Sequence, residues 1–377
     1  MKTNLSFLIL PLFFGFGIAN AQNVNIPDAN FKNYLLSVTA INTNSDGEIQ
    51  YSEAAAYTGG IYAAYKNIAD LTGIQAFTNV TTLQCNNNNL TSIDVSNNAA
   101  LKNLDCSNNS LTTLSVTNNP ALITFGCNNN QLTGLNCSSN PQLSVLNCGY
   151  NNLTGLNILS NSALTSLSCE NNNLPNLNVD YNPALVSLTC GNNQLPSLNL
   201  LNNLALKYLN CQNNQITYFD LYTLSALKEI RVYNNALTGL NVANGNNSNF
   251  TAFYATGNPN LMCIGVDNVA YMNTNWSSGK DPGAMYSTNC LTAGVATIEN
   301  DKSYSVYPNP SNGVFTIRSN SSGKQTANLY DVNGKLAFNK NMTGDTEINV
   351  NELNEGVYTL IIKSEDGVTA KKVVISK

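Results

Sequence analysis

The chain has 377 residues, of which 17 are Lys or Arg, 22 are Asp or Glu and none is His, so its formal net charge is −5. This balance argues against a nucleic-acid-binding protein, which needs a basic face. Hydrolases and metal enzymes that depend on imidazole are excluded by the absence of histidine. A chain of this length is expected to form two or three structural units.

The first 21 residues have the features of a secretion signal. Lys2 provides a short basic region, residues 5–18 are mostly apolar, and the small residues Ala19 and Ala21 flank Asn20 as at a signal-peptidase site. The apolar run is too short to span a membrane, and no later segment reaches about 18 continuous apolar residues. We therefore expect residues 1–21 to be removed, and an exported protein with no transmembrane segment.

Residues 22–58 are expected to form a helical N-terminal cap. Asp28 can cap a helix. The residues that follow give this helix one apolar face at helical spacing. They are Phe31, Tyr34, Leu35 and Leu36.

Within this cap, residues 42–53 resemble an EF-hand calcium loop. Oxygen-bearing side chains stand at loop positions 1, 3, 5 and 12, with glycine at position 6 and an apolar residue at position 8. The resemblance implies a structural Ca²⁺, the only cofactor expected. Its ligands would be Asn42, Asn44, Asp46, the carbonyl of Glu48, and Glu53. Asn42 stands where aspartate is usual, which lowers the expected affinity, and the alternative is an ion-free turn between two capping helices.

A repeat of 21 residues dominates residues 59–258. It is marked by seven cysteines, each of which closes an L-x-x-L-x-C pattern or a close variant of it and is followed three residues later by asparagine. These cysteines are Cys85, Cys106, Cys127, Cys148, Cys169, Cys190 and Cys211. The same apolar spacing recurs half a unit later, as in Leu111, Leu114 and Val116, and is again followed by asparagine.

This pattern resembles the leucine-rich-repeat family, in the 21-residue variety whose two halves are both strand-like. A 21-residue turn is too short for a strand, an α-helix and two loops, so each coil needs two extended arms, stacked about 4.8 Å apart. Nine coils are expected, after one divergent coil. Their strands should open at Val80, Leu101, Leu122, Leu143, Leu164, Leu185, Leu206, Leu227 and Phe250. The corner asparagines should adopt left-handed backbone geometry and bond the backbone of their own turn and of the next coil.

The ten cysteines divide into two groups. Inward side chains of a ladder lie parallel and do not face each other as a disulfide requires, so the ladder cysteines and Cys137 are predicted to be buried thiols that act as small apolar residues. Cys263 and Cys290 lie beyond the last regular coil. Because an open solenoid end must be covered, we expect residues 259–290 to form a cap fastened by a Cys263–Cys290 disulfide.

After a linker at residues 291–303, residues 304–377 read as a small antiparallel β-sandwich. Short β-type runs alternate with turn signals such as Asn312-Gly313, Asn333-Gly334 and Asp366-Gly367. Six strands are expected. They are 314–317, 327–330, 335–338, 347–350, 357–362 and 372–375.

This module also resembles the C-terminal sorting domain of the type IX secretion system. The resemblance is carried by four short motifs in the order typical of that family. They are Tyr307-Pro308-Asn309-Pro310, Leu329-Tyr330-Asp331, Glu355-Gly356-Val357-Tyr358 and Lys371-Lys372-Val373-Val374-Ile375. It implies that residues 304–377 engage the type IX machinery, and that the protein is secreted or attached to the outer surface of a Gram-negative bacterium.

The predicted fold is thus mainly β: a leucine-rich-repeat solenoid with a short helical N-terminal cap, followed by a small antiparallel sandwich. The function predicted is non-catalytic binding of a protein or glycan partner, an adhesion-type role. One alternative is a structural coat or matrix component. A second is a carboxylate-dependent glycan-active enzyme, which is disfavoured because Asp105, Glu170 and Glu229 form no cluster along the repeats.

A ligand-binding patch is expected on the last coils, where outward positions of the cysteine-bearing arm change from small polar to large residues. The patch residues are Tyr208, Glu229, Arg231, Tyr233 and Tyr254. Tyrosine and arginine dominate recognition surfaces because they add contact area and directional bonds at low entropic cost. Aromatic residues also suit exposed strands, so the alternative is an ordinary sheet face.

Overall fold

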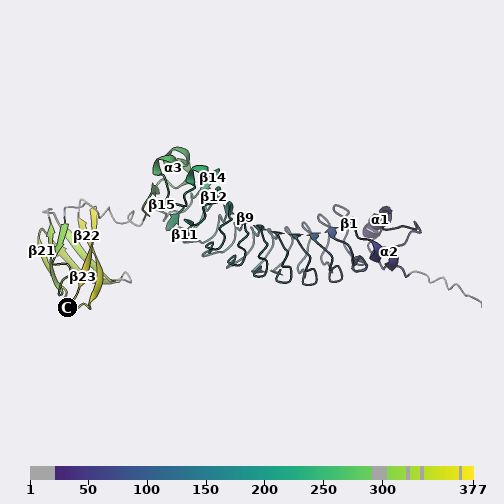
Figure 1. The fold of residues 1–377 in the computed structure, drawn as a ribbon, viewed down its shortest axis with the longest axis horizontal. Helices are drawn as coiled ribbons and strands as arrows, with labels where there is room; N and C mark the ends of the chain where they lie inside the picture. The colour runs from purple at the N-terminus through teal and green to yellow at the C-terminus, as the bar shows by residue number, and fades with distance from the viewer. Residues whose placement is uncertain (1–21, 291–303, 320–322, 332–334, 365–366) are drawn as a thin grey trace, which may run out of the picture. The chain divides into compact units, whose positions relative to one another are not determined.

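The structure is a computed structural model that describes residues 22–290, 304–319, 323–331, 335–364 and 367–377 (Figure 1). The expected signal sequence, residues 1–21, and the expected linker, residues 291–303, lie outside the described residues. The chain divides into two compact units, residues 1–164 and 165–377, which are treated separately. In the part of the chain that the structure describes, no helix combines the length and apolar character needed to cross a membrane.

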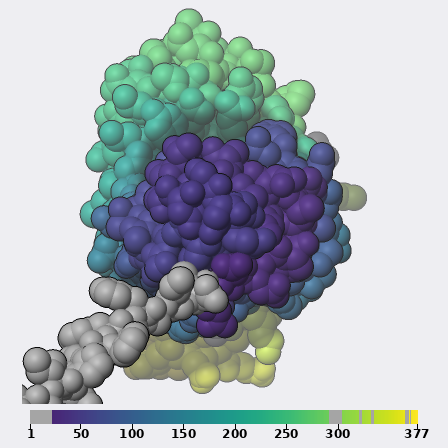
Figure 2. All heavy atoms as spheres, turned by 90° about the vertical axis from the view of Figure 1, so that its right-hand side faces the viewer, coloured from purple at the N-terminus to yellow at the C-terminus, as the bar shows by residue number. Residues whose placement is uncertain are grey.

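The first unit begins with a cap of two helices, α1 (Ala29–Ser37) and α2 (Tyr51–Ala56). The predicted N-cap is confirmed, because Asp28 Oδ1 accepts hydrogen bonds from the N–H groups of Asn30 and Phe31. The other oxygen, Oδ2, accepts from the N–H groups of Ala69 and Asp70 at 2.7 and 3.2 Å. One carboxylate therefore starts the helix and fastens it to the first coil. Figure 2 looks onto this end, where the N-terminal residues, in purple, form a closed surface.

The predicted apolar face of α1 packs as expected. Phe31 and Leu35 are fully buried, whereas Tyr34 and Leu36 are half-buried. The Tyr34 hydroxyl accepts a hydrogen bond of 2.6 Å from the N–H of Tyr62. Its ring therefore reaches the first strand of the solenoid, and α1 closes that end.

In the first unit, each coil contributes a three-residue strand on its cysteine-bearing arm, which we call the first arm. These parallel strands are β1 (Gly60–Tyr62), β2 (Thr82–Gln84), β3 (Asn103–Asp105), β4 (Thr124–Gly126) and β6 (Val145–Asn147). On the opposite arm, the second arm, β5 (Gly134–Asn136) pairs with β7 (Gly155–Asn157). A 3₁₀ helix, η1, spans Ile74–Ala76.

The second unit repeats this plan. Its first-arm strands are β8 (Ser166–Ser168), β9 (Ser187–Thr189), β10 (Tyr208–Asn210), β12 (Glu229–Arg231) and β14 (Ala252–Tyr254). Its second-arm strands are β11 (Tyr218–Asp220), β13 (Gly239–Asn241), β15 (Cys263–Gly265) and β16 (Met285–Ser287). Three short helices accompany the last coils: η2 (Asn247–Asn249), α3 (Val269–Asn275) and η3 (Ser277–Gly279).

The register confirms the stacked coils. Leu83 pairs with Leu104, and Leu104 with Phe125, so residues 21 positions apart lie side by side, and all three side chains are buried. The strands are shorter than predicted: β3, for example, begins at Asn103 rather than at Leu101.

The second arm differs from the prediction that both halves of every repeat are strand-like. Where the second arms pair, the N–H of Thr154 donates to the carbonyl of Thr133, and that of Thr238 to Thr217. The coils with no second-arm strand include those with proline at this same position, Pro175 and Pro196. Proline has no N–H to donate, so these two coils lack the bond that Thr154 and Thr238 make at this position.

The left-handed residue of each corner is also one position away from where we predicted it. Positive φ angles of 52–56° occur two residues after each of the seven ladder cysteines, where the residue is asparagine in every coil but one. Asn87 and Asn108 are examples, and Tyr150 is the exception with φ 54°. The asparagine three residues after the cysteine bonds through its side chain instead. Two neighbouring corner positions therefore differ in function: one adopts the left-handed backbone, and the next forms side-chain hydrogen bonds.

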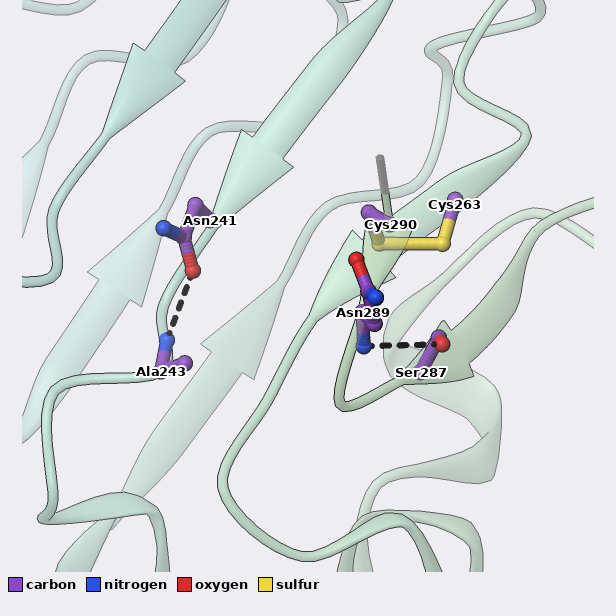
Figure 3. Close-up of a disulfide and its surroundings, with 6 residues drawn as sticks. All are labelled: Asn241, Ala243, Cys263, Ser287, Asn289 and Cys290. Carbon is purple, nitrogen blue, oxygen red and sulfur yellow. Dashed lines mark hydrogen bonds between the residues drawn. A yellow bond between two sulfur atoms is a disulfide. The ribbon is translucent and has the colours of Figure 1, made fainter. Parts of the chain in front are cut away.

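The ladder cysteines and Cys137 are buried thiols, as predicted. Burial raises the pKa of Cys137 and of Cys190 to about 12, so neither forms a thiolate near neutral pH. In the C-terminal cap, Cys263 and Cys290 are joined in a disulfide, with their Cα atoms 5.6 Å apart (Figure 3).

Residues 304–377 form the predicted antiparallel sandwich. One sheet has the order β17 (Tyr304–Tyr307), β18 (Val314–Ser319) and β21 (Thr346–Asn349). The other has the order β20 (Leu336–Met342), β19 (Gln325–Tyr330), β22 (Gly356–Ser364) and β23 (Gly367–Ile375). Both sheets contribute to one buried cluster that includes Phe315, Ile317, Leu329 and Leu360. The sequence reading missed β17, a four-residue strand followed directly by Pro308. The predicted turn signals at residues 333–334 and 366 lie outside the described residues.

Candidate binding surfaces

The predicted patch lies on neighbouring first-arm strands of the second unit. The register pairs Tyr208 with Glu229 in one outward row, and Arg231 with Tyr254 in the next. Tyr208 and Tyr254 are 39% and 43% exposed. The structure therefore brings these four side chains onto one exposed face.

The charged residues of the patch hold one another in place. Arg231 Nη2 lies 3.5 Å from Glu229 Oε2, and the Arg231 guanidinium carbon lies 5.2 Å from the centre of the Tyr254 ring. At partly exposed positions such contacts are each worth about 1 kcal/mol or less. They orient the arginine without burying its hydrogen-bonding groups, so it stays available to a partner.

Tyr233 is the exception among the predicted patch residues. It lies beyond the end of β12, is half-buried, and its carbonyl accepts a hydrogen bond from the N–H of Asn213. Within the described residues, no ring contact connects it to Tyr208 or Tyr254. We define the patch below as Tyr208, Glu229, Arg231 and Tyr254.

The loop at residues 42–53 is tightly folded around its acidic side chains. Asn44 Oδ1 accepts from the N–H of Asp46, and Asp46 Oδ1 accepts from the N–H of Glu48. The backbone is left-handed at Ser45 and Gly47, with φ of 59° and 83°. The bond from the Glu48 N–H, with further bonds from the side chains of Gln50 and Asn44, lowers the pKa of Asp46 below its usual value.

Glu53 connects the two ends of this loop. Its Oε1 accepts from the N–H and the hydroxyl of Thr43, both at 2.8 Å, and its Oε2 accepts from the N–H of Gln50 at 3.1 Å. Partial burial works to raise the pKa of Glu53, but these bonds outweigh it and lower the pKa. Glu53 is therefore charged near neutral pH.

Asn42 and Glu48 complete the predicted ligand set. Asn42 is only 7% exposed, and its Oδ1 accepts no hydrogen bond from the described residues. The Glu48 carboxylate pairs with Lys32 at 2.7 Å, which leaves only its carbonyl for a ligand role. No group of three or more His, Cys, Asp or Glu suited to a metal occurs in the described part of the chain. An ion here would depend on amide and carbonyl oxygens beside two carboxylates, a donor set that suits a hard cation.

The acidic residues considered for catalysis remain apart. Glu170 lies two residues after the end of β8, whereas Glu229 lies on β12, and β9 and β10 lie between these strands. Asp105 Oδ1 accepts from the N–H and the hydroxyl of Ser107, which marks a turn rather than a reactive carboxylate.

The sequence reading missed a hollow on the second arm of the last coils. Its lining includes Tyr218, Asp220 and Asn241. The predicted ligand site was confined to outward positions of the first arm. The repeat did contain a sequence signal for this hollow. Tyr218 stands 21 residues before Gly239, and two further coils also have glycine at the equivalent position.

Comparisons with known proteins give one family match at the C-terminal end and several similar solved structures. Residues 305–376 match the family model of a secretion system C-terminal sorting domain. No curated protein matches the chain in sequence. Among solved structures, the functional domain of InlJ from Listeria monocytogenes, which includes a cysteine ladder, is 20% identical with a TM-score of 0.46, and the match covers 94% of this chain and 100% of that one.

Two further similar structures are leucine-rich-repeat proteins. One, from Leptospira interrogans, is 24% identical with a TM-score of 0.42, and the match covers 52% of this chain and 51% of that one. The other is YopM from Yersinia pestis, a leucine-rich effector, at 25% identity and a TM-score of 0.40, with 50% and 60% covered. This chain thus spans about half the length of the Leptospira protein.

Proposed function

Because this chain is a leucine-rich-repeat protein with a type IX secretion system C-terminal sorting domain, we propose that it is a non-catalytic binding protein of the cell surface. Its partner, a protein or a glycan, binds the patch formed by Tyr208, Glu229, Arg231 and Tyr254. The sorting domain implies export and a surface or extracellular location. We place it on the outer surface of a Gram-negative bacterium, in an adhesion-type role.

The observation that carries this proposal is the concentration of large side chains on two adjacent rows. In the same two outward rows, the preceding strands β8 and β9 carry only Ser166, Ser168, Ser187 and Thr189. An exposed arginine held between a carboxylate and an aromatic ring offers directional bonds beside a flat contact area, which is typical of binding hot spots.

The test is binding of the full chain to arrays of bacterial and host surface proteins and polysaccharides. We expect a saturable interaction that weakens at least tenfold in a Tyr208→Ala/Arg231→Ala variant. The control is Tyr181→Ala, which removes a more exposed tyrosine elsewhere in the second unit. Binding that survives the patch variant contradicts the assignment of the site. A folded chain that binds nothing favours the coat or matrix alternative.

We further propose that the loop at residues 42–53 holds a structural Ca²⁺ through Asn42, Asn44, Asp46, the Glu48 carbonyl and Glu53. Support comes from Asn42 Oδ1, which is buried and accepts no hydrogen bond from the described residues. Burying such an oxygen costs free energy unless it gains a partner, and a bound ion would be that partner. An ion at this position would lock the turn that connects α1 to α2 and so stabilise the N-terminal cap.

Thermal unfolding of the full chain in calcium and in chelator tests this ion. Calcium should raise the melting temperature of the cap by a few degrees, because a ligand at about 100 times its Kd contributes about 2.7 kcal/mol. The effect should vanish in Asp46→Ala. Glu48→Gln is the matched control, since it keeps the ligating carbonyl and should retain the shift. Identical melting temperatures in calcium and in chelator would contradict the proposed Ca²⁺ site.

A further inference from the structure

A hollow of about 580 Å³ lies on the second arm of the last coils, within the second unit. Its floor is formed by outward positions of β13 and β15, and its rim by β11 on one side and the segment after β16 on the other. This volume is within the range of ligand pockets, roughly 300–1,000 Å³. The hollow is separate from the patch, which lies on the first arm.

Two glycines shape the floor. A Cβ atom at Gly239 would lie 2.8 Å from both Cδ2 and Cε2 of Tyr218, so the Tyr218 ring lies directly over the Gly239 backbone. A Cβ atom at Gly265 would lie 2.7 Å from Asn241 Oδ1, so that amide lies over the next strand in the same way. Any side chain at either glycine would push these groups away.

The floor therefore presents a flat aromatic ring beside a polar pair. The Tyr218 side chain is 58% exposed, so part of its ring remains open to solvent. Asn241 Nδ2 donates to Asp220 Oδ1 at 2.9 Å, while Asn241 Oδ1 accepts from the N–H of Ala243 at 3.1 Å. These bonds fix the orientation of the amide. Asp220 Oδ2 accepts no bond from the described residues and can take one from a ligand.

The opposite rim is held by covalent and hydrogen bonds (Figure 3). Cys290 is tied to Cys263 of β15 by the disulfide, and the N–H of Asn289 donates to Ser287 Oγ at 3.1 Å. Thr288 and Asn289 are exposed and line the hollow. Thr288 and Asn289 thus add a hydroxyl and an amide to the lining, in a segment that the disulfide ties to β15.

We infer that this hollow is a binding subsite for a neutral saccharide. The C–H face of a sugar ring packs on a flat aromatic surface such as Tyr218, and sugar hydroxyls donate to Asp220 and exchange bonds with the amides and hydroxyl of the rim. Asp220 is the only charged residue among the described residues of the lining, and its carboxylate repels acidic sugars and phosphates. The paired strands of the floor leave no backbone edge for an extended peptide.

This inference rests on the proposed function in one respect, that the chain is an exported binding protein, but it concerns a different site. The test is binding of the full chain to immobilised neutral polysaccharides: β-glucan, mannan, xylan and chitin oligosaccharides. We expect saturable binding to at least one of them. It should fall at least tenfold in Tyr218→Ala and severalfold in Asp220→Asn.

Two matched variants separate this site from its surroundings. Tyr222→Ala removes a similarly exposed tyrosine outside the lining and should leave saccharide binding unchanged. Gly239→Ala keeps every lining side chain but displaces the Tyr218 ring, and should weaken binding if the flat ring is what matters. Thermal melts establish that each variant is folded.

Three outcomes would overturn the inference: no binding to any neutral saccharide, binding unchanged in folded Tyr218→Ala, or selective binding of lysine-rich peptides that is lost in Asp220→Asn. The last would mean that the carboxylate recognises cations. A partner that is lost in Arg231→Ala but kept in Tyr218→Ala would support the proposed function alone. Saccharide binding lost only in the Tyr218 variants would support this site alone.

Discussion

Two columns of asparagine recur with the same 21-residue period but are bonded differently. The corner column stands three residues after each ladder cysteine, and after Val232 in the next coil: Asn88, Asn109, Asn130, Asn151, Asn172, Asn193, Asn214 and Asn235. The second column follows the second arm: Asn98, Asn119, Asn140, Asn161, Asn182 and Asn203. The two are equally regular in sequence, so the sequence offers no way to rank them.

In the corner column the amide is satisfied at both ends. Asn130 Nδ2 donates to the carbonyls of Cys127 in its own coil and Cys106 in the preceding one, both at 3.1 Å. Its Oδ1 accepts from the N–H of Leu111 at 2.9 Å. Each such side chain replaces three backbone partners that neither helix nor sheet supplies at a corner.

In the second column only the donor end is used. Asn119 Nδ2 donates to the carbonyls of Val95 and Asn98, at 3.0 and 2.9 Å. Its Oδ1 is buried and accepts no hydrogen bond from the described residues. An uncompensated buried oxygen opposes folding by about 1–3 kcal/mol, which offsets part of what the two donated bonds contribute. Two asparagine columns with the same period therefore contribute differently to the free energy of folding.

The largest effect is expected for Asn130→Ala in the corner column. The change leaves the buried Leu111 N–H without its acceptor and removes one of two asparagine donors from the carbonyls of Cys106 and Cys127, to which Asn109 and Asn151 still donate. It should lower the free energy of unfolding by about 2–3 kcal/mol. Urea unfolding followed by circular dichroism measures it as a fall in the midpoint. A loss below about 1 kcal/mol would mean that the corner backbone finds other partners.

Asn119→Ala in the second column should have a smaller effect, about 1–2 kcal/mol, because removing the side chain also removes its unsatisfied oxygen. Unfolding midpoints of the two variants, measured side by side, give the difference directly. If Asn119→Ala destabilises the chain as much as Asn130→Ala does, the distinction between the columns is wrong.

The cysteine beside the corner should contribute about 1 kcal/mol through packing. Cys127→Ala removes a fully buried sulfur, whereas Cys127→Ser should be worse because it buries a hydroxyl. Burial raises the pKa of the Cys127 thiol well above its usual value, so the thiolate is absent from the folded state even at mildly alkaline pH. Iodoacetamide at pH 8 should therefore label the ladder only after unfolding, and rapid labelling of the folded chain would contradict the burial.

The smallest effect, and the only stabilising one, is expected at Tyr150. This residue adopts the left-handed backbone that asparagine adopts in the other regular coils, and its side chain is 53% exposed. Tyr150→Asn should stabilise the chain by up to about 1 kcal/mol, since asparagine tolerates this conformation better. Asn129→Tyr, the reverse change one coil earlier, should destabilise it by a similar amount. Differential scanning calorimetry of the pair gives both shifts.

Several features of the binding surfaces could be predicted and others could not. The alternation of inward and outward residues placed Tyr208, Glu229, Arg231 and Tyr254 together, because strands 21 to 23 residues apart pair in register. Tyr233 lies beyond the end of β12, so strand pairing does not place it with these four. The hollow beside Tyr218 escaped prediction because it depends on side chains that lean across glycines of the next strand.

The sequence by itself determined the coil, its stacking, the buried thiols and the sandwich at the C-terminal end. Each of these follows from the spacing of apolar residues. That spacing specifies which neighbouring residues, and which equivalent positions of adjacent coils, pack together. Only the tertiary structure decided which asparagine is left-handed, which second arms pair and which buried oxygens are satisfied. Those outcomes depend on whether a particular donor, such as the N–H that Pro175 lacks, comes within bonding distance of the next coil. The distance between such a donor and its acceptor cannot be inferred from composition and residue spacing.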